Sequence, residues 1–170
     1  MQAFYRNYIS VQRATVLFLR QLRHPPPCYP CMKTVESIRC ILIDDHEEEH
    51  DLFRLGLKAS GLPVICHCYF SAGEAYEVLY HRSSPEPKVI FLDVNMPRMN
   101  GIEFLQKIKS VEHLKHIPVF VYSLGEFTES KQQALELGAV DYLLKPDTGT
   151  ELSAMLLTAL QPYLPGTGSH

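Results

Sequence analysis

The chain has 170 residues, 46% of them apolar and 21% charged, with a formal net charge of −3. That composition is ordinary for a globular protein, and the length suits one domain with some additional chain. The acidic balance argues against nucleic acid as a partner, and the longest apolar runs are too short to span a membrane.

Residues 1–33 differ from the rest in charge. They contain five basic residues and no acidic one, so the remainder carries −8. The cluster His24-Pro25-Pro26-Pro27 ends any helix and is typical of a linker. A transit peptide or a basic amphipathic helix would also fit this composition. We favour a basic, proline-rich and poorly ordered extension over residues 1–34, or chain upstream of a natural start at Met32.

The cysteines number five: Cys28, Cys31, Cys40, Cys66 and Cys68. An odd count, with three in apparent core strands, indicates reduced thiols and a cytoplasmic location. The Cys28-x-x-Cys31 pair lies in the proline-rich linker, and no matching second pair completes a zinc set. In Cys66-His67-Cys68, strand alternation places both sulfurs on one face and His67 on the other, which favours packing over metal binding.

From residue 38 onward, apolar runs alternate with segments of helical pattern. The runs predict strands over residues 38–43, 64–70, 89–92, 117–122 and 140–144. The remaining segments predict helices over residues 47–60, 71–82, 101–110, 126–137 and 148–161. Capping-box spacing at Ser71 and Thr148 supports the starts of two of these helices. Gly61 and Gly138 directly follow the helices over residues 47–60 and 126–137 and support their ends.

Five strands alternating with five helices predict an α/β fold. Its centre would be a doubly wound, five-stranded parallel sheet with right-handed crossovers and helices on both faces. The folded unit would cover residues 35–164, which leaves no room for a second domain, and residues 165–170 would form a flexible tail.

Acidic residues follow two of the predicted strands. Asp44 and Asp45 come after the first strand, and Asp93 follows the third. Open α/β sheets carry their chemistry at the carboxyl ends of the strands, where these two strands can be neighbours. Carboxylates crowded there would repel by roughly 4 kcal/mol per close pair at an effective dielectric constant near 20, so a cation is expected. An oxygen-rich, partly hydrated site suits Mg²⁺.

Two further polar residues lie at the same predicted edge. Ser123 ends the fourth strand, and Lys145 ends the fifth, just before Pro146. Any one such residue is usually solvated or caps a helix, as Asp45 could do. Five of them at successive strand ends are hard to assemble by accident, and together they fit phosphoryl chemistry.

These motifs resemble those of response-regulator receiver domains of two-component signalling, of the single-domain, chemotaxis-regulator-like kind. The motifs are Asp44-Asp45, Asp93-x-Asn95-Met96-Pro97, Ser123 and Tyr142-Leu143-Leu144-Lys145-Pro146. Their order and separations fit the family across residues 35–164. The resemblance implies a flavodoxin-like (βα)5 fold with strand order 2-1-3-4-5.

The resemblance also implies a role for each acidic residue. Asp93 would be the phosphoacceptor and would share in binding Mg²⁺. Asp45 would bind the ion directly, with Asp44 assisting through water. The backbone carbonyl of Asn95 would complete the protein ligands.

A signalling cycle, rather than conventional enzyme activity, follows from this resemblance. A sensor histidine kinase or a histidine phosphotransfer protein would donate the phosphoryl group, which Lys145 would contact. The bond from Lys145 to Pro146 would be cis. Ser123, the switch hydroxyl, would then bond the phosphoryl group, and Tyr142, the switch aromatic, would turn inward. The changed surface would be read by a downstream protein effector, and a homodimer is compatible with this cycle.

Leu124 departs from the family pattern, in which the residue after the switch hydroxyl is usually small. Its side chain could narrow access to Asp93. We therefore expect altered rates of phosphorylation or dephosphorylation.

Other functional classes fit the sequence less well. His46-Glu47-Glu48-Glu49-His50 matches the H-E-x-x-H pattern of zinc proteases, but no third ligand is evident and the α/β alternation is wrong for that class. A phosphohydrolase with an aspartyl-phosphate intermediate needs a second acid two residues after the nucleophile, where this chain has Asn95. A receiver-like module that no longer binds phosphate would not need all five polar residues.

Overall fold

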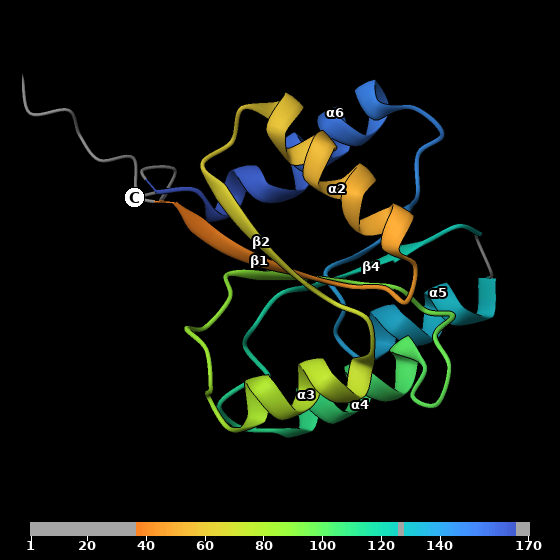
Figure 1. The fold of residues 1–170 in the computed structure, drawn as a ribbon. Coiled ribbons are helices and arrows are strands. Elements are labelled where there is room, and N and C mark those ends of the chain that lie inside the picture. Colours follow the sequence, from red (N-terminus) through yellow and green to blue (C-terminus); the bar gives the residue numbers. More distant parts are fainter. Residues whose placement is uncertain (1–36, 126–127, 166–170) are drawn as a thin grey trace, which may run out of the picture. The chain divides into compact units, whose positions relative to one another are not determined.

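A computed structural model describes residues 37–125 and 128–165. Its strands are β1 (Ile38–Ile43), β2 (Val64–Tyr69), β3 (Val89–Leu92), β4 (Val119–Ser123) and β5 (Asp141–Leu144). Its helices are α2 (Glu47–Ser60), α3 (Ala72–Tyr80), α4 (Gly101–Ser110), α5 (Thr128–Glu136), α6 (Gly149–Leu160) and the short 3₁₀ helix η1 (Gln161–Tyr163). In Figure 1, α2 and α6 cover one face of the sheet, and α3, α4 and α5 cover the other.

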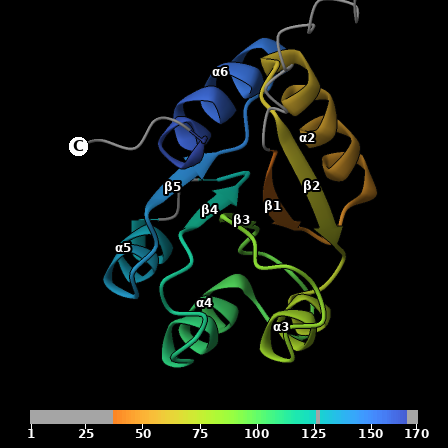
Figure 2. The ribbon, with the colours of Figure 1, turned by 90° about the vertical axis from the view of Figure 1, so that its left-hand side faces the viewer.

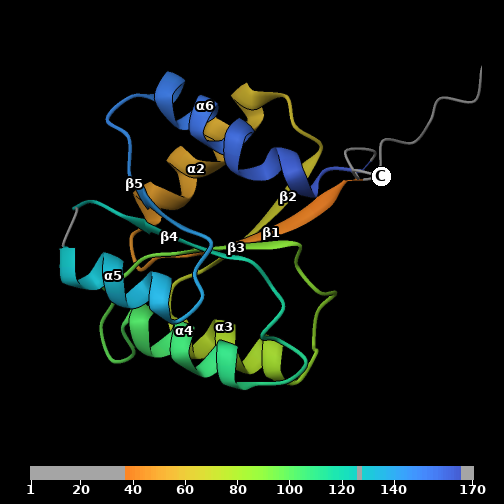
Figure 3. The ribbon, with the colours of Figure 1, turned by 180° about the vertical axis from the view of Figure 1, so that it is seen from behind.

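The five strands form one parallel sheet in the order β2-β1-β3-β4-β5 (Figure 2). This confirms the predicted α/β class, the doubly wound topology and the strand order. The chain reverses its direction of winding between β1 and β3, so these two strands flank the topological switch point. β5 forms one edge of the sheet, and the chain passes from it to α6 (Figure 3).

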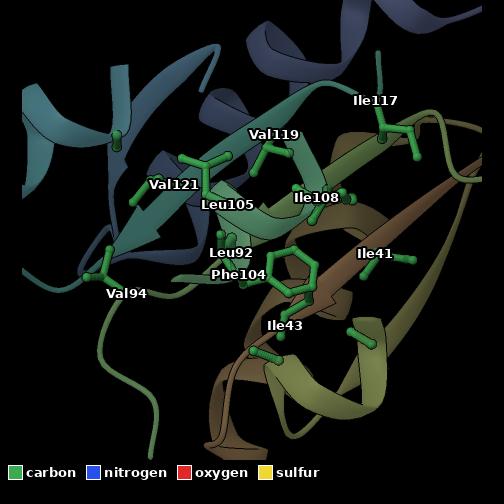
Figure 4. Packing of buried hydrophobic residues seen from close by; sticks show 14 of the residues in the cluster. Ile41, Ile43, Leu92, Val94, Phe104, Leu105, Ile108, Ile117, Val119 and Val121 are labelled. Carbon is green, nitrogen blue, oxygen red and sulfur yellow. The ribbon is translucent and has the colours of Figure 1, made fainter. Parts of the chain in front are cut away.

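Two apolar clusters, one on each face of the sheet, hold the layers together. The first packs strand residues such as Ile43, Leu92 and Val121 against Phe104 and Ile108 of α4 (Figure 4). The second lies under α2 and α6. Because β1, β3 and β4 are covered on both faces, they are apolar almost without interruption, as buried parallel strands require.

Among the strands, β4 has the boundaries that differ most from those expected. The strand was expected over residues 117–122 but runs over Val119–Ser123. The Ile117 N–H donates to Leu114 O within a turn, and Pro118 has no N–H to offer the sheet. At the other end Ser123 pairs with Leu144, which extends the strand by one residue.

The helix starts are fixed by side-chain caps. The side chains of Ser71 and Thr148 each accept a hydrogen bond from the backbone N–H three residues later, as expected at the starts of α3 and α6. A full capping box at Asn100 and Glu103, which was not predicted, begins α4. Gly61 ends α2 with φ of +69°, a left-handed conformation in which glycine carries no Cβ penalty.

Most of the predicted terminal segments lie outside the described residues. The extension over residues 1–34 falls wholly outside them, and so do residues 166–170. None of the helices within residues 37–125 and 128–165 is long and apolar enough to cross a membrane.

Candidate functional site

Strand register brings the predicted site residues together at the carboxyl edge of the sheet. Ile43 pairs with Leu92, so Asp44 and Asp93, the next residues, emerge side by side. Backbone hydrogen bonds continue the ladder beyond the strands, because the Asp93 N–H donates to Ile43 O at 2.9 Å and the Lys145 N–H donates to Ser123 O at 2.8 Å. The first residue of each of these two loops is therefore still hydrogen-bonded to the neighbouring strand.

Lys145 links the acidic residues of this edge. Its Nζ donates to Asp44 Oδ2 at 2.6 Å and lies 3.2 Å from Asp93 Oδ1 and 3.9 Å from Glu49 Oε2. The same ammonium lies 5.4 Å from the centre of the Tyr122 ring, within cation–π range. The Lys145, Asp44 and Asp93 side chains are 3%, 0% and 6% exposed, so their charges face one another with little water between them.

Burial and charge act in opposite directions on these groups. Burial raises the pKa of Asp93 and the neighbouring Asp44 adds to this, while Lys145 and the Asn95 N–H oppose it. Burial alone would lower the pKa of Lys145, but its hydrogen bond to Asp44 and the charges of Asp93, Asp44 and Glu49 raise it overall. Lys145 is therefore a permanent cation in the pocket, and Asp93 holds a proton more readily than an exposed aspartate.

Asp45 and His46 complete the acidic loop after β1. Asp45 is partly exposed, and its Oδ1 lies 3.2 Å from His46 Nδ1. The backbone N–H of His46 donates to Asp44 Oδ1 at 3.0 Å. One potential metal-ligating atom from each of these three residues lies within 4.8 Å of the others, so the loop can present oxygen and nitrogen ligands to one ion.

The loop after β3 fixes the orientation of the Asp93 carboxylate. The backbone N–H of Asn95 donates to Asp93 Oδ2 at 2.8 Å, while the other carboxylate oxygen faces Lys145. Gly101, at the start of α4, packs so closely against this loop that a Cβ there would meet Asp93 O at 2.2 Å and Val94 Cα at 2.9 Å. Only glycine allows this approach of helix to loop.

Ser123 and Tyr142 lie on neighbouring strands beside the acidic residues. Ser123 is fully buried, and its Oγ makes no hydrogen bond to any of the described residues. Tyr142 is also buried, and its hydroxyl donates to Gly125 O at 2.8 Å. The tyrosine thus already occupies an inward position in this structure. A buried hydroxyl without a protein partner is costly unless a water, an ion or a ligand bonds it.

The expected cis bond between Lys145 and Pro146 is wrong for this structure. The described residues contain no cis peptide bond, so this bond is trans. The trans form is intrinsically favoured before proline by about 0.5–1 kcal/mol. Lys145 reaches both Asp44 and Asp93 from the trans backbone.

Leu124, expected to narrow access to Asp93, has a largely solvent-exposed side chain. It is 72% exposed and lines a cavity of about 380 Å³ with Lys145 and the α2 residues Leu52 and Leu55. Asp93 is not among the residues that line this cavity. The expected effect on phosphorylation rates stays a prediction.

Two residues of α2 that were not predicted as site residues also belong to the pocket. Glu49 adds a third carboxylate near Lys145, and its place in the acidic first turn of the helix that follows Asp44 and Asp45 could have indicated this. His50 is 1% exposed and its Nε2 donates to Asp44 O at 2.8 Å, which secures the acidic loop. That contact buries His50 while the His46 side chain is 60% exposed, so the two imidazoles do not form an open zinc face.

The charges of the pocket fit a divalent cation. Among the described residues, the carboxylates of Asp44, Asp93 and Glu49 lie within 4 Å of the single ammonium of Lys145, and Asp45 adds a fourth carboxylate on the adjoining loop. With all of them ionised, three negative charges remain uncompensated by that lysine. Hard carboxylate oxygens of this kind are the ligands that Mg²⁺ and Mn²⁺ accept.

Known proteins similar to this chain share its fold. A family model described as the response regulator receiver domain matches residues 40–157. The transcriptional regulatory protein PrrA of Mycobacterium leprae (strain TN) is 30% identical over 127 residues, which cover 75% of this chain and 52% of that protein. The chain therefore spans about half the length of this curated relative.

Solved structures agree with the family match. The Mn(2+)-bound form of response regulator Rcp1 is 26% identical with a TM-score of 0.68, over 78% of this chain and 99% of that one. Chemotaxis protein CheY4 of Vibrio cholerae is 27% identical with a TM-score of 0.61, over 76% of this chain and all (100%) of that one. Because the family model covers well over half of its length, this chain belongs to the response regulator receiver domain family.

Proposed function

We propose that this chain is a phosphoacceptor response regulator in which Asp93 accepts a phosphoryl group from a histidine kinase or a histidine phosphotransfer protein. The observation that carries the proposal is the buried bridge of Lys145 between Asp44 and Asp93. A lysine held there by two carboxylates is in place to meet the negative charge of an incoming phosphoryl group.

A divalent cation, Mg²⁺ in the proposal, completes the site. Asp44, Asp45, Asp93 and the backbone carbonyl of Asn95 would hold it. The unbalanced negative charge of the pocket and its oxygen-rich composition support this assignment. When bound, the ion would neutralise charge on the phosphoryl oxygens. The similar protein Rcp1 was solved in a Mn(2+)-bound form, which is consistent with a divalent ion here.

The transfer itself exchanges one bond to phosphorus for another. A carboxylate oxygen of Asp93 attacks the phosphorus of a phosphohistidine, the P–N bond breaks with its electron pair left on the imidazole, and an acyl phosphate forms. Burial raises the pKa of Asp93 and so disfavours the ionised nucleophile. Lys145 and the Asn95 N–H oppose that effect by stabilising the carboxylate.

Ser123 and Tyr142 then relay the change to the surface. The unbonded hydroxyl of Ser123 would donate to a phosphoryl oxygen. Tyr142 is the switch aromatic in this proposal, and its bond to Gly125 O joins it to the loop that follows Ser123. A shift of that loop would alter a surface that a downstream protein effector reads. Residues 35–164 would act as one cytoplasmic unit, either alone or as a homodimer.

The test is Mg²⁺-dependent labelling of Asp93. Wild type and Asp93→Asn are incubated with acetyl phosphate or beryllofluoride in the presence and absence of Mg²⁺, and the product is followed by mass spectrometry or NMR. We expect labelling of wild type only with Mg²⁺ and none of Asp93→Asn. Labelling that survives in Asp93→Asn would overturn the assignment of the phosphoacceptor. No beryllofluoride binding by wild type would instead favour a receiver-like module that has lost phosphate binding.

A further inference from the structure

Two cysteines on the edge strand β2 lie close together, away from the acidic pocket. Cys66 and Cys68 project from the same face, and their sulfur atoms are 3.8 Å apart. His67 between them is exposed on the opposite face. Both thiols are partly buried against the apolar cluster under α2 and α6, and β2 has no strand on its outer side.

The separation of the sulfurs matches a pair of ligands on one tetrahedral ion. Zinc–thiolate bonds are about 2.3 Å long, and a tetrahedral angle between two such bonds places the sulfurs about 3.8 Å apart. The observed distance between Cys66 Sγ and Cys68 Sγ is the same. A disulfide needs sulfurs about 2.05 Å apart, so the two thiols are not joined here. They lie in thiol–thiol contact, at a distance that a bridging ion could keep.

A third thiol lies behind the pair. Cys40 of β1 is fully buried and directly opposite Cys66 in the strand register. A hydrogen bond from the Cys66 thiol to Cys40 raises the pKa of Cys66, the hydrogen bond with Cys68 lowers it, and burial raises it further. The hydrogen bond to Cys66 and burial raise the pKa of Cys68. Burial and crowding together therefore favour the protonated form of both thiols.

One nearby cation already favours the ionised form. The charge of Arg54, on α2, lowers the pKa of both Cys66 and Cys68, although burial and the neighbouring thiols outweigh it. Its guanidinium is half exposed and also contacts Asp51 at 3.3 Å. A bound metal ion would act in the same direction as Arg54 but at shorter range.

We propose that Cys66 and Cys68 form a two-thiolate binding site for a soft divalent metal ion such as Zn²⁺ or Cd²⁺. Binding replaces two S–H protons, which are released to solvent, with two metal–sulfur bonds. No electron is transferred and no oxidant is needed. Water fills the remaining positions. The site is separate from the carboxylate pocket, whose hard oxygens suit a different class of ion.

The experiment uses the full chain and Cd²⁺ as the probe. The parent is Cys28→Ser/Cys31→Ser, which removes the cysteine pair outside the described residues. Cd²⁺ is titrated in the presence of excess Mg²⁺, and thiolate-to-cadmium charge-transfer absorption is recorded. Carboxylate-bound cadmium does not give this absorption. We expect one ion per chain, and Cys66→Ser or Cys68→Ser in the parent should weaken binding by at least about 100-fold, more than loss of an outer-shell partner does.

A second measurement avoids the substitutions at β2. Wild-type protein is alkylated with iodoacetamide with and without Cd²⁺, and the modified peptides are mapped by mass spectrometry. We expect Cd²⁺ to protect Cys66 and Cys68. The proposal is overturned by equal alkylation of these two residues in both samples. The proposal also fails if the Cys28→Ser/Cys31→Ser parent shows no charge-transfer absorption with Cd²⁺. It fails as well if the Cys66→Ser and Cys68→Ser variants, shown by circular dichroism to be folded, keep the full absorption of the parent.

Discussion

The protein has two clusters of crowded acidic groups, the carboxylates at the carboxyl edge of the sheet and the thiols on β2, and they differ in how the crowding is stabilised. Asp44 and Asp93 share the buried ammonium of Lys145, and the cluster is held together by charge. The half-exposed Arg54 lies beside Cys66 and Cys68 and lowers their pKa values, but burial and the neighbouring thiols outweigh it, so both pKa values are raised and both thiols keep their protons. Crowded acids are thus stabilised either by an internal cation or by keeping their protons.

The difference has consequences for what each cluster can do. The carboxylates can stay charged at neutral pH, which suits a site that accepts a phosphoryl group and a hard ion. The thiols release protons only when a strongly bound ion replaces them. The comparison can be tested by removing Lys145 from the carboxylate cluster, and by removing Asp93 from that cluster and Cys66 and Cys68 from the thiol cluster.

Removal of the internal cation should have the largest effect. Lys145→Met leaves Asp44 and Asp93 buried without a counter-charge, and we expect a loss of about 3–5 kcal/mol in the free energy of unfolding in urea. Lys115→Met is the control, because Lys115 pairs with Glu112 at the surface and should cost at most about 1 kcal/mol. Equal losses in the two variants would show that the pocket does not depend on its lysine.

A methyl group added at the helix start beside the pocket should lower the free energy of unfolding, whereas one added at another helix start should not. Gly101 and Gly149 are both the first residues of helices, but a Cβ at Gly101 meets Asp93 O whereas one at Gly149 meets nothing within 4 Å. We expect Gly101→Ala to lower the unfolding free energy by about 1–3 kcal/mol and Gly149→Ala to leave it unchanged or raise it by up to about 1 kcal/mol. Thermal and urea unfolding of both variants would decide; a neutral Gly101→Ala contradicts the close packing.

The pH dependence of Asp93→Asn tests the charge of the carboxylate cluster. Because the folded pKa of Asp93 is raised above 3.8, the stability contributed by its protonated form is present below pH 3.8 and is lost as pH rises through the folded pKa. Asp93→Asn should therefore gain stability over wild type as pH rises from about 4 toward neutrality. Asp51→Asn, at an exposed position of α2, should follow wild type within about 0.5 kcal/mol. A constant difference between Asp93→Asn and wild type would contradict the raised pKa.

The thiol cluster should respond at the opposite end of the pH scale. The folded pKa values of Cys66 and Cys68 lie above the ordinary 9.0, so the stability from their protonated forms is present below pH 9.0 and is lost as pH rises beyond it. Wild type should lose stability above pH 9.0 relative to Cys66→Ser/Cys68→Ser, while at neutral pH the two should differ by about 1 kcal/mol or less. Parallel curves through the alkaline range would refute the shared protonation.

Removal of the Leu124 side chain, which tests access to the carboxylate cluster, should have the smallest effect. Leu124 lines a cavity together with Lys145, and its removal should change the rate of acetyl phosphate labelling by less than about tenfold, equivalent to about 1.4 kcal/mol in the barrier. The measurement compares wild type and Leu124→Ala at saturating Mg²⁺, with Leu157→Ala as an exposed control on α6. An unchanged labelling rate would refute a role for Leu124 in access.

Most residues of the pocket could be predicted from the sequence, because the end of an apolar run marks the end of a strand. Asp44 and Asp93 follow apolar runs directly, so the edge on which they lie could be predicted from the strands alone. Glu49 and His50 were harder to predict, since their roles depend on how α2 rotates and tilts over the sheet. The pattern H-E-x-x-H drew attention to His50 as a zinc ligand, yet the structure uses it to hold Asp44 O.

Local chemistry in the sequence determined the elements, and tertiary packing decided which side chains meet. Apolar runs and capping residues specified the strands and helices, because burial of both sheet faces and unsatisfied helix ends leave recognisable residue patterns. The 2.6 Å bond between Lys145 and Asp44, the close approach of Gly101 to Asp93 and the 3.8 Å sulfur pair depend on strand register, helix placement and side-chain rotamers. These are set by contacts between residues far apart in the chain or by fine geometry, neither of which leaves a local pattern.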